Sequence, residues 1–313
     1  MADWKVMLTD GLEEKGQSIL RESAEVANRK GISAEELLQE AGDLDAIIVR
    51  SRTKVTPEVF KAAKKLKVVG RAGVGVDNID LDAARRAGVT VVNSPYATSV
   101  AVAELTLGLM LSLVREIPRA DAAMKRGEWL KKDLMGKELY QKTLGLIGLG
   151  RIGSVVGKRA AAFEMQVLAY DPLVPADEIR SRGAEPVSLD TLLERSDIIS
   201  LHVSLNETTR NLLNAETFNR MKSGVYLVCA ARGGVIDEQA LFEALESGKV
   251  AGAGLDVFAA EPPGPTPLVN HPRVIAAPHI GAQSIEAQER AAEDIATEVL
   301  AALRGDPLRW KVA

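Results

Sequence analysis

The sequence predicts an α/β protein with two doubly wound parallel-sheet domains, and three observations support this. The chain has 313 residues, more than a single hydrophobic core usually accommodates. Short apolar runs alternate with helix-like segments, as expected for parallel strands joined by crossover helices. The same alternation starts again near residue 143, after a long apolar segment. A last helix, at about 284–304, has alanine and charged faces and is expected to pack back on the first domain, which would make that domain discontinuous.

The expected elements follow in chain order. In the first domain the strands are WKVMLT, AIIV at 46–49, KVVG at 67–70 and VTVVN at 89–93. A helix over 99–119, ending near Pro118, then begins the second domain. Its apolar run, 99–114, is short for a bilayer and contains Glu104 and Gly108, so we predict a buried helix and no membrane span. Six more strands are predicted in TLGLIGL, QVLAY, DIISLH, VYLVCA, VAGAGLDV and RVIAA.

Composition limits the class of protein. The hydrophobic fraction of 46% and the charged fraction of 26% are those of an ordinary globular protein, neither disordered nor fibrous, and the net charge of −4 argues against non-specific nucleic-acid binding. A single cysteine, Cys229, excludes an intrachain disulfide, and MADWKVMLTD lacks the features of a secretory signal, so we expect a cytoplasmic protein. Residues 46–75 carry eight basic side chains and one acidic one. A solvated lysine-rich helix face explains four of them, Lys61, Lys64, Lys65 and Lys67, but it explains Arg50 and Arg71 less well, since each follows a strand-like run.

A glycine motif marks a nucleotide site. Gly148, Gly150 and Gly153 lie in GLGRIG, between the strand TLGLI and a helix-like segment. Glycines at these positions allow a tight turn, a close backbone approach to a pyrophosphate and close helix–strand packing. The next strand ends at Asp171, where a carboxylate would bind ribose hydroxyls and repel a 2′-phosphate, which favours NAD over NADP. The alternative is a tight strand–helix turn with an aspartate that caps the next segment.

Three strand ends predict a chemical site. Arg232, Glu261 and His279 each follow a predicted strand, and doubly wound domains bind ligands at the carboxyl ends of their strands. A guanidinium can hold a carboxylate, a histidine can move a hydroxyl proton, and a neighbouring carboxylate can orient the imidazole and favour its protonated form. The alternative is a surface salt bridge beside a capped strand end. Of the other histidines, His202 ends a strand and either touches the cofactor or is structural, and His271 is expected to face solvent.

Over almost its entire length the chain resembles the D-isomer-specific 2-hydroxyacid dehydrogenases. The resemblance rests on VRSRTKVTPEV, VVGRAGVGVDNIDLDAARRAGVTVVNSP, KTLGLIGLGRIG, ARGGVIDEQAL, GAGLDVFAAEPP and PHIGAQS. It implies a Rossmann NAD-binding domain, 99–285, inserted in a flavodoxin-like substrate-binding domain, 1–98 plus 286–313. It also implies a homodimer, with no nucleic acid, membrane or metal as partner.

The resemblance also implies roles for individual residues. The catalytic residues would be Arg232, Glu261 and His279. The substrate would contact Arg50, Arg71 and the backbone of Val74 and Gly75. The expected cofactor contacts are Gly148, Gly150, Arg151, Ile152, Gly153, Asp171, His202, Ala230 and Asp256.

The phosphoglycerate-oxidising members are the most similar, so the expected reaction is NAD-dependent oxidation of 3-phospho-D-glycerate to 3-phosphohydroxypyruvate, the first step of serine biosynthesis. Two departures bear on the substrate: NSPYAT stands at 93–98 where the family often has NxPxGN, and Val74 stands where many such members have threonine. The alternatives are a reductase of glyoxylate, hydroxypyruvate or another 2-keto acid, and an NAD-sensing corepressor-like protein. Formate dehydrogenases of this family have glutamine in place of Glu261, which disfavours that activity. The serine-sensing domains of longer members are not in the sequence, so we do not expect serine feedback through them.

Overall fold

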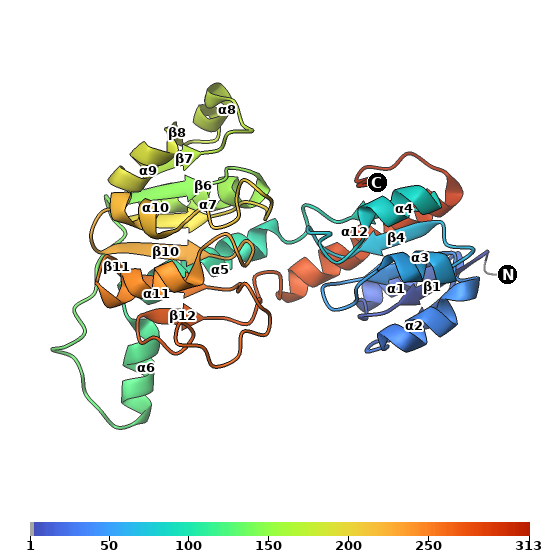
Figure 1. Cartoon of the computed structure of the whole chain (residues 1–313), viewed down its shortest axis with the longest axis horizontal. Helices are drawn as coiled ribbons and strands as arrows, with labels where there is room; N and C mark the ends of the chain where they lie inside the picture. The colour runs from blue at the N-terminus through green and yellow to red at the C-terminus, as the bar shows by residue number, and fades with distance from the viewer. Residues whose placement is uncertain (1–2) are drawn as a thin grey trace. The chain divides into compact units, whose positions relative to one another are not determined.

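The computed structural model describes residues 3–313, which form two compact units (Figure 1). The first unit contains the described residues up to Ser99 together with Ala282–Ala313, and the second contains Val100–Gly281. The chain therefore leaves the first unit once and returns to it with its last helix.

The first unit has a five-stranded parallel sheet in the order β2-β1-β3-β4-β5. This is the order of flavodoxin-like doubly wound sheets. The strands β3 and β4 at its centre are almost entirely buried, because helices cover both faces of the sheet. The strands are β1 (Trp4–Leu8), β2 (Ala24–Asn28), β3 (Ala46–Val49), β4 (Val68–Arg71) and β5 (Thr90–Asn93).

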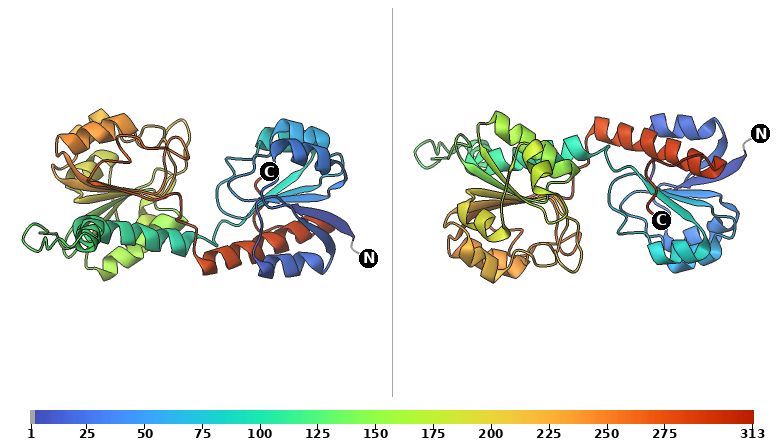
Figure 2. Two further views of the ribbon diagram at one scale, coloured as in Figure 1. Left: turned by 90° about the horizontal axis from the view of Figure 1, so that it is seen from below. Right: turned by 90° about the horizontal axis from the view of Figure 1, so that it is seen from above.

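Two groups of helices cover the faces of this sheet (Figure 2). On one face α1 (Glu14–Arg21) packs against α12 (Ile285–Arg304), and the two backbones approach so closely that a Cβ on Gly16 would lie 2.5 Å from the carbonyl oxygen of Ala292. The return of α12 therefore completes the core of the first unit. The other face carries α2 (Ala34–Glu40), the short 3₁₀ helix η1 (Ala41–Asp43), α3 (Pro57–Ala62) and α4 (Leu81–Ala87).

The second unit has a seven-stranded parallel sheet in the order β12-β11-β10-β9-β6-β7-β8. The chain order reverses between β6 and β9, and such a switch point is where doubly wound sheets bind nucleotides at the carboxyl ends of their strands. The strands are β6 (Thr143–Ile147), β7 (Gln166–Tyr170), β8 (Glu185–Pro186), β9 (Ile198–Leu201), β10 (Val225–Cys229), β11 (Val250–Leu255) and β12 (Val274–Ala276).

Helices also cover both faces of the second sheet (Figure 2). One hydrophobic core includes α5 (Ser99–Val114), α7 (Arg151–Ala162) and α8 (Ala176–Ser181). The core on the opposite face includes α9 (Leu189–Arg195), α10 (Ala215–Arg220) and α11 (Glu238–Glu246). Because both faces are covered, all of these strands except the edge strand β8 are apolar runs, and this pattern allowed them to be predicted.

The two predicted parallel sheets are confirmed, with three differences in the elements. The strands β2 and β8 were not predicted, because both lie at sheet edges and their sequences, AEVAN and EP, lack an apolar run. The helix predicted over 99–119 ends at Val114, and α6 (Ile117–Lys125) begins after it. Pro118 occupies the first turn of α6, where a missing N–H costs no hydrogen bond. No helix of the described residues is long and apolar enough to cross a membrane.

Candidate active site

The glycine turn after β6 is closely packed on one side and open on the other. Gly148 has φ +91°, and a Cβ there would lie 2.6 Å from the carbonyl oxygen of His202. A Cβ on Gly153 would lie 2.2 Å from the carbonyl oxygen of Gly148, whereas a Cβ on Gly150 would meet nothing within 4 Å. The turn leads into α7, whose first residues are Arg151 and Ile152. The open position at the amino end of a helix fits a pyrophosphate.

Asp171 lies beside this turn, as the sequence predicts. One carboxylate oxygen accepts the N–H of Leu149 at 2.8 Å, and the other accepts the N–H of Leu173 at 2.9 Å. The guanidinium of Arg182 donates to the carbonyl oxygen of Leu149 and also contacts Ser154. Sequence reasoning missed Arg182, because it follows a short helix 11 residues after Asp171 and belongs to no motif. The carboxylate and the turn lie together, as the ribose and pyrophosphate of a dinucleotide require.

His202 is a neutral, largely fixed side chain at the same turn. The backbone N–H of His202 donates to the carbonyl oxygen of Ile147 at 2.8 Å, and the imidazole Nε2 lies 2.9 Å from the hydroxyl of Ser200. Burial lowers the pKa of His202 to about 4, so the imidazole is uncharged at neutral pH. Its Nδ1 is buried and has no hydrogen-bond partner among the described residues. Ala230, another predicted contact, follows β10 and is 8% exposed.

The predicted pair of Glu261 and His279 is present. Nδ1 of His279 lies 2.8 Å from Oε2 of Glu261, and both side chains are partly exposed. The other oxygen of Glu261 accepts the N–H of Phe258 at 3.1 Å, which fixes the carboxylate to its own loop. Because Nδ1 faces the carboxylate, Nε2 is the ring nitrogen that can exchange a proton with a ligand.

A buried carboxylate holds the histidine in place. His279 has φ +54°, a left-handed conformation that non-glycine residues rarely adopt. Asp256, which follows β11 and is 1% exposed, accepts the N–H groups of Ile280 and Gly281, each at 2.7 Å. Burial raises the pKa of Asp256, and these two hydrogen bonds act in the opposite direction. The side chain expected to contact the cofactor therefore also shapes the loop of His279.

Arg232 lies on the loop after β10, next to the loop that carries Glu261. Its guanidinium donates to the carbonyl oxygen of Ala231 at 2.7 Å. The two loops touch at Gly233, where a Cβ would lie 1.8 Å from the carbonyl oxygen of Phe258. The strands β10, β11 and β12 are neighbours in the sheet, so Arg232, Glu261 and His279 follow three adjacent strand ends.

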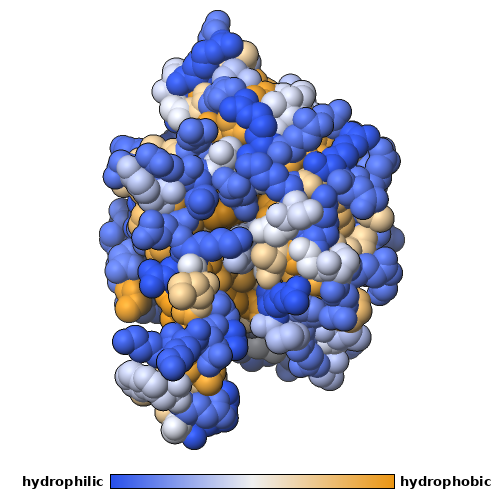
Figure 3. Space-filling view, turned by 90° about the vertical axis from the view of Figure 1, so that its left-hand side faces the viewer, coloured by the Kyte–Doolittle hydropathy of each residue, from blue (hydrophilic) through white to orange (hydrophobic). Residues whose placement is uncertain are grey.

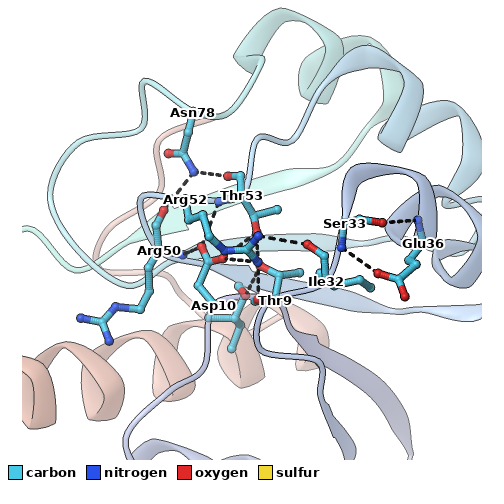
Figure 4. Close-up of polar contacts among 10 residues, drawn as sticks. Thr9, Asp10, Ile32, Ser33, Glu36, Arg50, Arg52, Thr53 and Asn78 are labelled. Atoms are coloured by element: carbon cyan, nitrogen blue, oxygen red, sulfur yellow. Dashed lines mark hydrogen bonds and ion pairs between the residues drawn. The ribbon is translucent and has the colours of Figure 1, made fainter. Parts of the chain in front are cut away.

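The predicted anion-binding residues lie in the first unit. Arg50 follows β3 (Figure 4). Its guanidinium lies 3.4 Å from Glu13. Arg71 ends β4, and its guanidinium donates to the carbonyl oxygen of Ala72 at 2.6 Å and covers Gly73. The loop continues through Val74, whose carbonyl oxygen accepts a hydrogen bond from Asn93 at 2.7 Å, and Gly75. Two arginines and a tight backbone loop thus occupy neighbouring strand ends.

The prediction that His271 faces solvent is wrong. His271 is 6% exposed, its Nε2 lies 3.0 Å from Glu246, and its Nδ1 accepts the N–H of Arg273 at 3.1 Å. The loop before β12 folds the ring against Phe242, and no sequence signal indicates this contact. Among the described residues no group of three or more histidine, cysteine, aspartate or glutamate side chains could hold a metal ion.

Comparison with known proteins identifies the family. Residues 107–281 match the family model of the D-isomer specific 2-hydroxyacid dehydrogenase NAD binding domain. The chain is 50% identical over 303 residues to a D-3-phosphoglycerate dehydrogenase of Methanocaldococcus jannaschii, with 96% of this chain and 58% of that protein covered. The chain thus spans less than three fifths of that relative's length.

Solved structures cover the whole chain. A glyoxylate reductase from Paecilomyes thermophila aligns with a TM-score of 0.90 and 33% identity over 100% of this chain and 99% of that one. A D-lactate dehydrogenase from Aquifex aeolicus, complexed with NAD and lactic acid, aligns with a TM-score of 0.83 and 33% identity over 96% of each chain. The chain therefore belongs to the D-isomer specific 2-hydroxyacid dehydrogenase family, and residues 107–281 correspond to its NAD binding domain.

Proposed function

We propose that the chain catalyses the NAD-dependent oxidation of 3-phospho-D-glycerate to 3-phosphohydroxypyruvate, a reaction that begins serine biosynthesis. The 2.8 Å contact between His279 and Glu261 is the observation that supports the reaction type, because it orients an imidazole for proton transfer. The second unit would bind NAD, and the first unit would bind the substrate anions. We also place the reaction in the cytoplasm, because the one cysteine allows no intrachain disulfide.

The residues of the second unit would divide the chemistry among them. NAD, when bound, supplies the acceptor for the hydride from C2 of the substrate. Nε2 of His279 takes the proton of the C2 hydroxyl, and Glu261 holds the ring in the required tautomer and stabilises its protonated form. The guanidinium of Arg232 orients the carboxylate and stabilises the charge that develops on the C2 oxygen.

The cofactor fits the residues that are present. Gly150 leaves space where a side chain would block a pyrophosphate, and Asp171 sits at the turn where ribose hydroxyls need an acceptor. His202 and Ala230 would line the same turn, with the imidazole as a neutral donor or acceptor. The carboxylate of Asp171 disfavours a 2′-phosphate at this place, so we propose NAD as the cofactor.

The phosphorylated substrate is proposed from the charges of the first unit. Arg50 and Arg71 follow neighbouring strands, and two guanidinium groups suit a phosphate better than a single one does. The backbone N–H groups of Val74 and Gly75 would bind the substrate carboxylate. The name of the Methanocaldococcus jannaschii relative supports the same substrate.

The second candidate is reduction of glyoxylate or hydroxypyruvate. The likeness to the glyoxylate reductase, which covers both chains almost completely, favours it. A 2-keto acid without a phosphate would need only Arg232 and the backbone of Val74 and Gly75. It would make no contact with Arg50.

A substrate panel separates the two candidates. The purified chain is assayed in the direction of reduction with NADH and phosphohydroxypyruvate, hydroxypyruvate, glyoxylate and pyruvate, and the substrates are ranked by kcat/KM. We expect phosphohydroxypyruvate to rank first and Arg50→Ala to raise its KM while leaving the KM for hydroxypyruvate nearly unchanged. A higher kcat/KM for glyoxylate or hydroxypyruvate would reject the phosphoglycerate proposal.

We further propose that the chain forms a homodimer through the second unit. The segment from α6 to the start of β6 exposes large apolar side chains, which a second copy would cover. Figure 3 shows apolar surface beside the lower protrusion, which is α6 in Figure 1. Sedimentation equilibrium tests this proposal, and a monomer at micromolar concentration would reject it. The exposed side chains are Ile117 at 50%, Met124 at 56%, Trp129 at 75%, Met135 at 84% and Tyr140 at 50%.

A further inference from the structure

A buried carboxylate organises the loop that carries Arg50 (Figure 4). The side chain of Asp10, which follows β1, is only 5% exposed. Its Oδ2 accepts the N–H of Arg50 at 2.7 Å and the N–H of Thr53 at 3.1 Å, and its Oδ1 accepts the hydroxyl of Thr53 at 2.6 Å. The carboxylate therefore fixes both ends of the turn 50–53.

Asn78 holds the same two residues from the opposite side. Its side-chain amide donates to the carbonyl oxygen of Arg50 at 2.9 Å and to that of Thr53 at 2.6 Å. The backbone carbonyl oxygen of Asn78 accepts the N–H of Val55 at 2.8 Å. Asp10 thus binds the N–H groups of the turn, and Asn78 binds the carbonyl groups of the same residues.

The two arginines of this turn have different environments. The guanidinium of Arg52 lies 3.1 Å from Asp10 and also donates to the carbonyl oxygens of Thr9 and Ile32, so it neutralises the buried carboxylate. The side chain of Arg50 points away from this cluster in Figure 4, and its guanidinium contacts Glu13 at 3.4 Å. The network therefore uses one arginine internally and directs the other outward.

Asn78 also connects Arg50 to the loop after β4. It lies four residues after Val74 on that loop, and Asn93, at the end of β5, anchors the loop through the carbonyl oxygen of Val74. One side chain therefore ties the turn of Arg50 to the segment that contains Val74 and Gly75. If Arg50 binds a phosphate and Val74 and Gly75 bind a carboxylate, Asn78 controls the separation of the two anion sites.

We propose that Asp10 and Asn78 are positioning residues that hold Arg50 at a fixed distance from Val74 and Gly75, and so select substrates with a phosphate at the matching distance from the carboxylate. The inference rests on the proposed function and adds the residues that set its specificity. A misplacement of about 1 Å at a binding group can cost about 10²-fold in rate. Loss of the clamp should therefore affect the phosphorylated substrate more than the unphosphorylated one, which uses Val74 and Gly75 but not Arg50.

Two variants and a matched control test the clamp. Asn78→Ala removes both donors, and Asp10→Ala removes both oxygens that accept from Arg50 and Thr53. The control is Asp45→Ala at the opposite end of β3, since Asp45 also accepts a backbone N–H, that of Lys5 at 3.0 Å, and pairs with a cation, Lys67 at 3.0 Å. For each protein kcat/KM is measured with phosphohydroxypyruvate and with hydroxypyruvate, and Tm is measured alongside.

We expect both clamp variants to lower kcat/KM for phosphohydroxypyruvate by about tenfold or more, and that for hydroxypyruvate by less than about threefold. Asp45→Ala should lower Tm without changing the ratio of the two values. In an Arg50→Ala background, Asn78→Ala should have no further effect on the ratio, because residues that act through one group are not additive. A merely structural role would give equal losses for both substrates and the same loss in both backgrounds.

The outcomes separate the two proposals. A wild-type chain without preference for phosphohydroxypyruvate would overturn the proposed substrate and the selective role of the clamp together. A wild-type preference that survives in both clamp variants, or that falls equally with and without Arg50, would overturn the clamp and leave the proposed function intact.

Discussion

Substitution of Gly233 by alanine should separate the two loops that carry Arg232 and Glu261. A Cβ at this position would lie 1.8 Å from the carbonyl oxygen and 2.1 Å from the carbonyl carbon of Phe258, and both are backbone atoms that cannot rotate away. Real Cβ atoms essentially never approach closer than 3.0 Å, so the loops must part by about 1.2 Å. Overpacking of this kind costs about 1–3 kcal/mol of stability.

The catalytic effect should be about as large as the effect on stability, because a 100-fold loss in rate corresponds to about 2.7 kcal/mol. Because a shift of about 1 Å in a positioned group can cost about 10²-fold, we expect kcat to fall about 100-fold in Gly233→Ala. The affinity for NAD, measured by fluorescence titration, should change less than about threefold, since the glycine turn after β6 is not moved. Gly108→Ala in α5 is the control, because a Cβ there meets nothing within 4 Å. A folded Gly233→Ala protein with kcat within threefold of the wild type would refute this account.

Three further predictions concern single side chains. His279→Gln should lower kcat by about 10²–10⁴-fold while NAD still binds, as measured by steady-state kinetics and titration; normal turnover would exclude this residue as the base. Asp256→Asn leaves one of the N–H groups of Ile280 and Gly281 without an acceptor. We therefore expect the free energy of unfolding in urea to fall by about 1–3 kcal/mol, and kcat to fall as well. An unchanged kcat would mean that Asp256 does not position His279. Between pH 7.5 and 5.0 the wild type should lose about 2 kcal/mol more stability than His202→Gln, because the unfolded imidazole takes up a proton below pH 6.5 and the folded one only near pH 4. Urea unfolding at the two pH values measures these losses, and equal losses for the wild type and His202→Gln would contradict the lowered pKa of His202.

The sequence predicted those parts of the molecule that depend on local patterns. Buried parallel strands are apolar runs, and residues directly after them meet at one edge, so the places of Arg232, Glu261 and His279 followed from the strands. The edge strands β2 and β8 were not predicted because backbone pairing defines a strand, and segments that are only partly buried need no apolar run.

Contacts between segments that are far apart in the sequence could not be predicted. The sequence gives Arg50 and Arg52 the same appearance in VRSR, yet one faces outward and the other neutralises Asp10, 42 residues earlier in the chain. The burial of His271 similarly depends on contacts with Glu246 and Phe242, 25 and 29 residues away. Such pairings depend on strand order and loop shape, and neither of these produces a periodic pattern in the sequence.

The balance of energies at His279 explains why the loop needs Asp256. A left-handed backbone at a non-glycine residue costs about 1–3 kcal/mol, so the isolated loop would prefer another conformation. Two hydrogen bonds to a buried carboxylate contribute about 1.5–3 kcal/mol each, so both together offset that cost, whereas one alone would not always do so. The hydrogen bond to Glu261 therefore orients the imidazole ring of His279 and is not needed to hold the backbone. Backbone and ring are thus fixed by different carboxylates, so loss of Glu261 should disturb the orientation of the imidazole while the loop of His279 keeps its conformation.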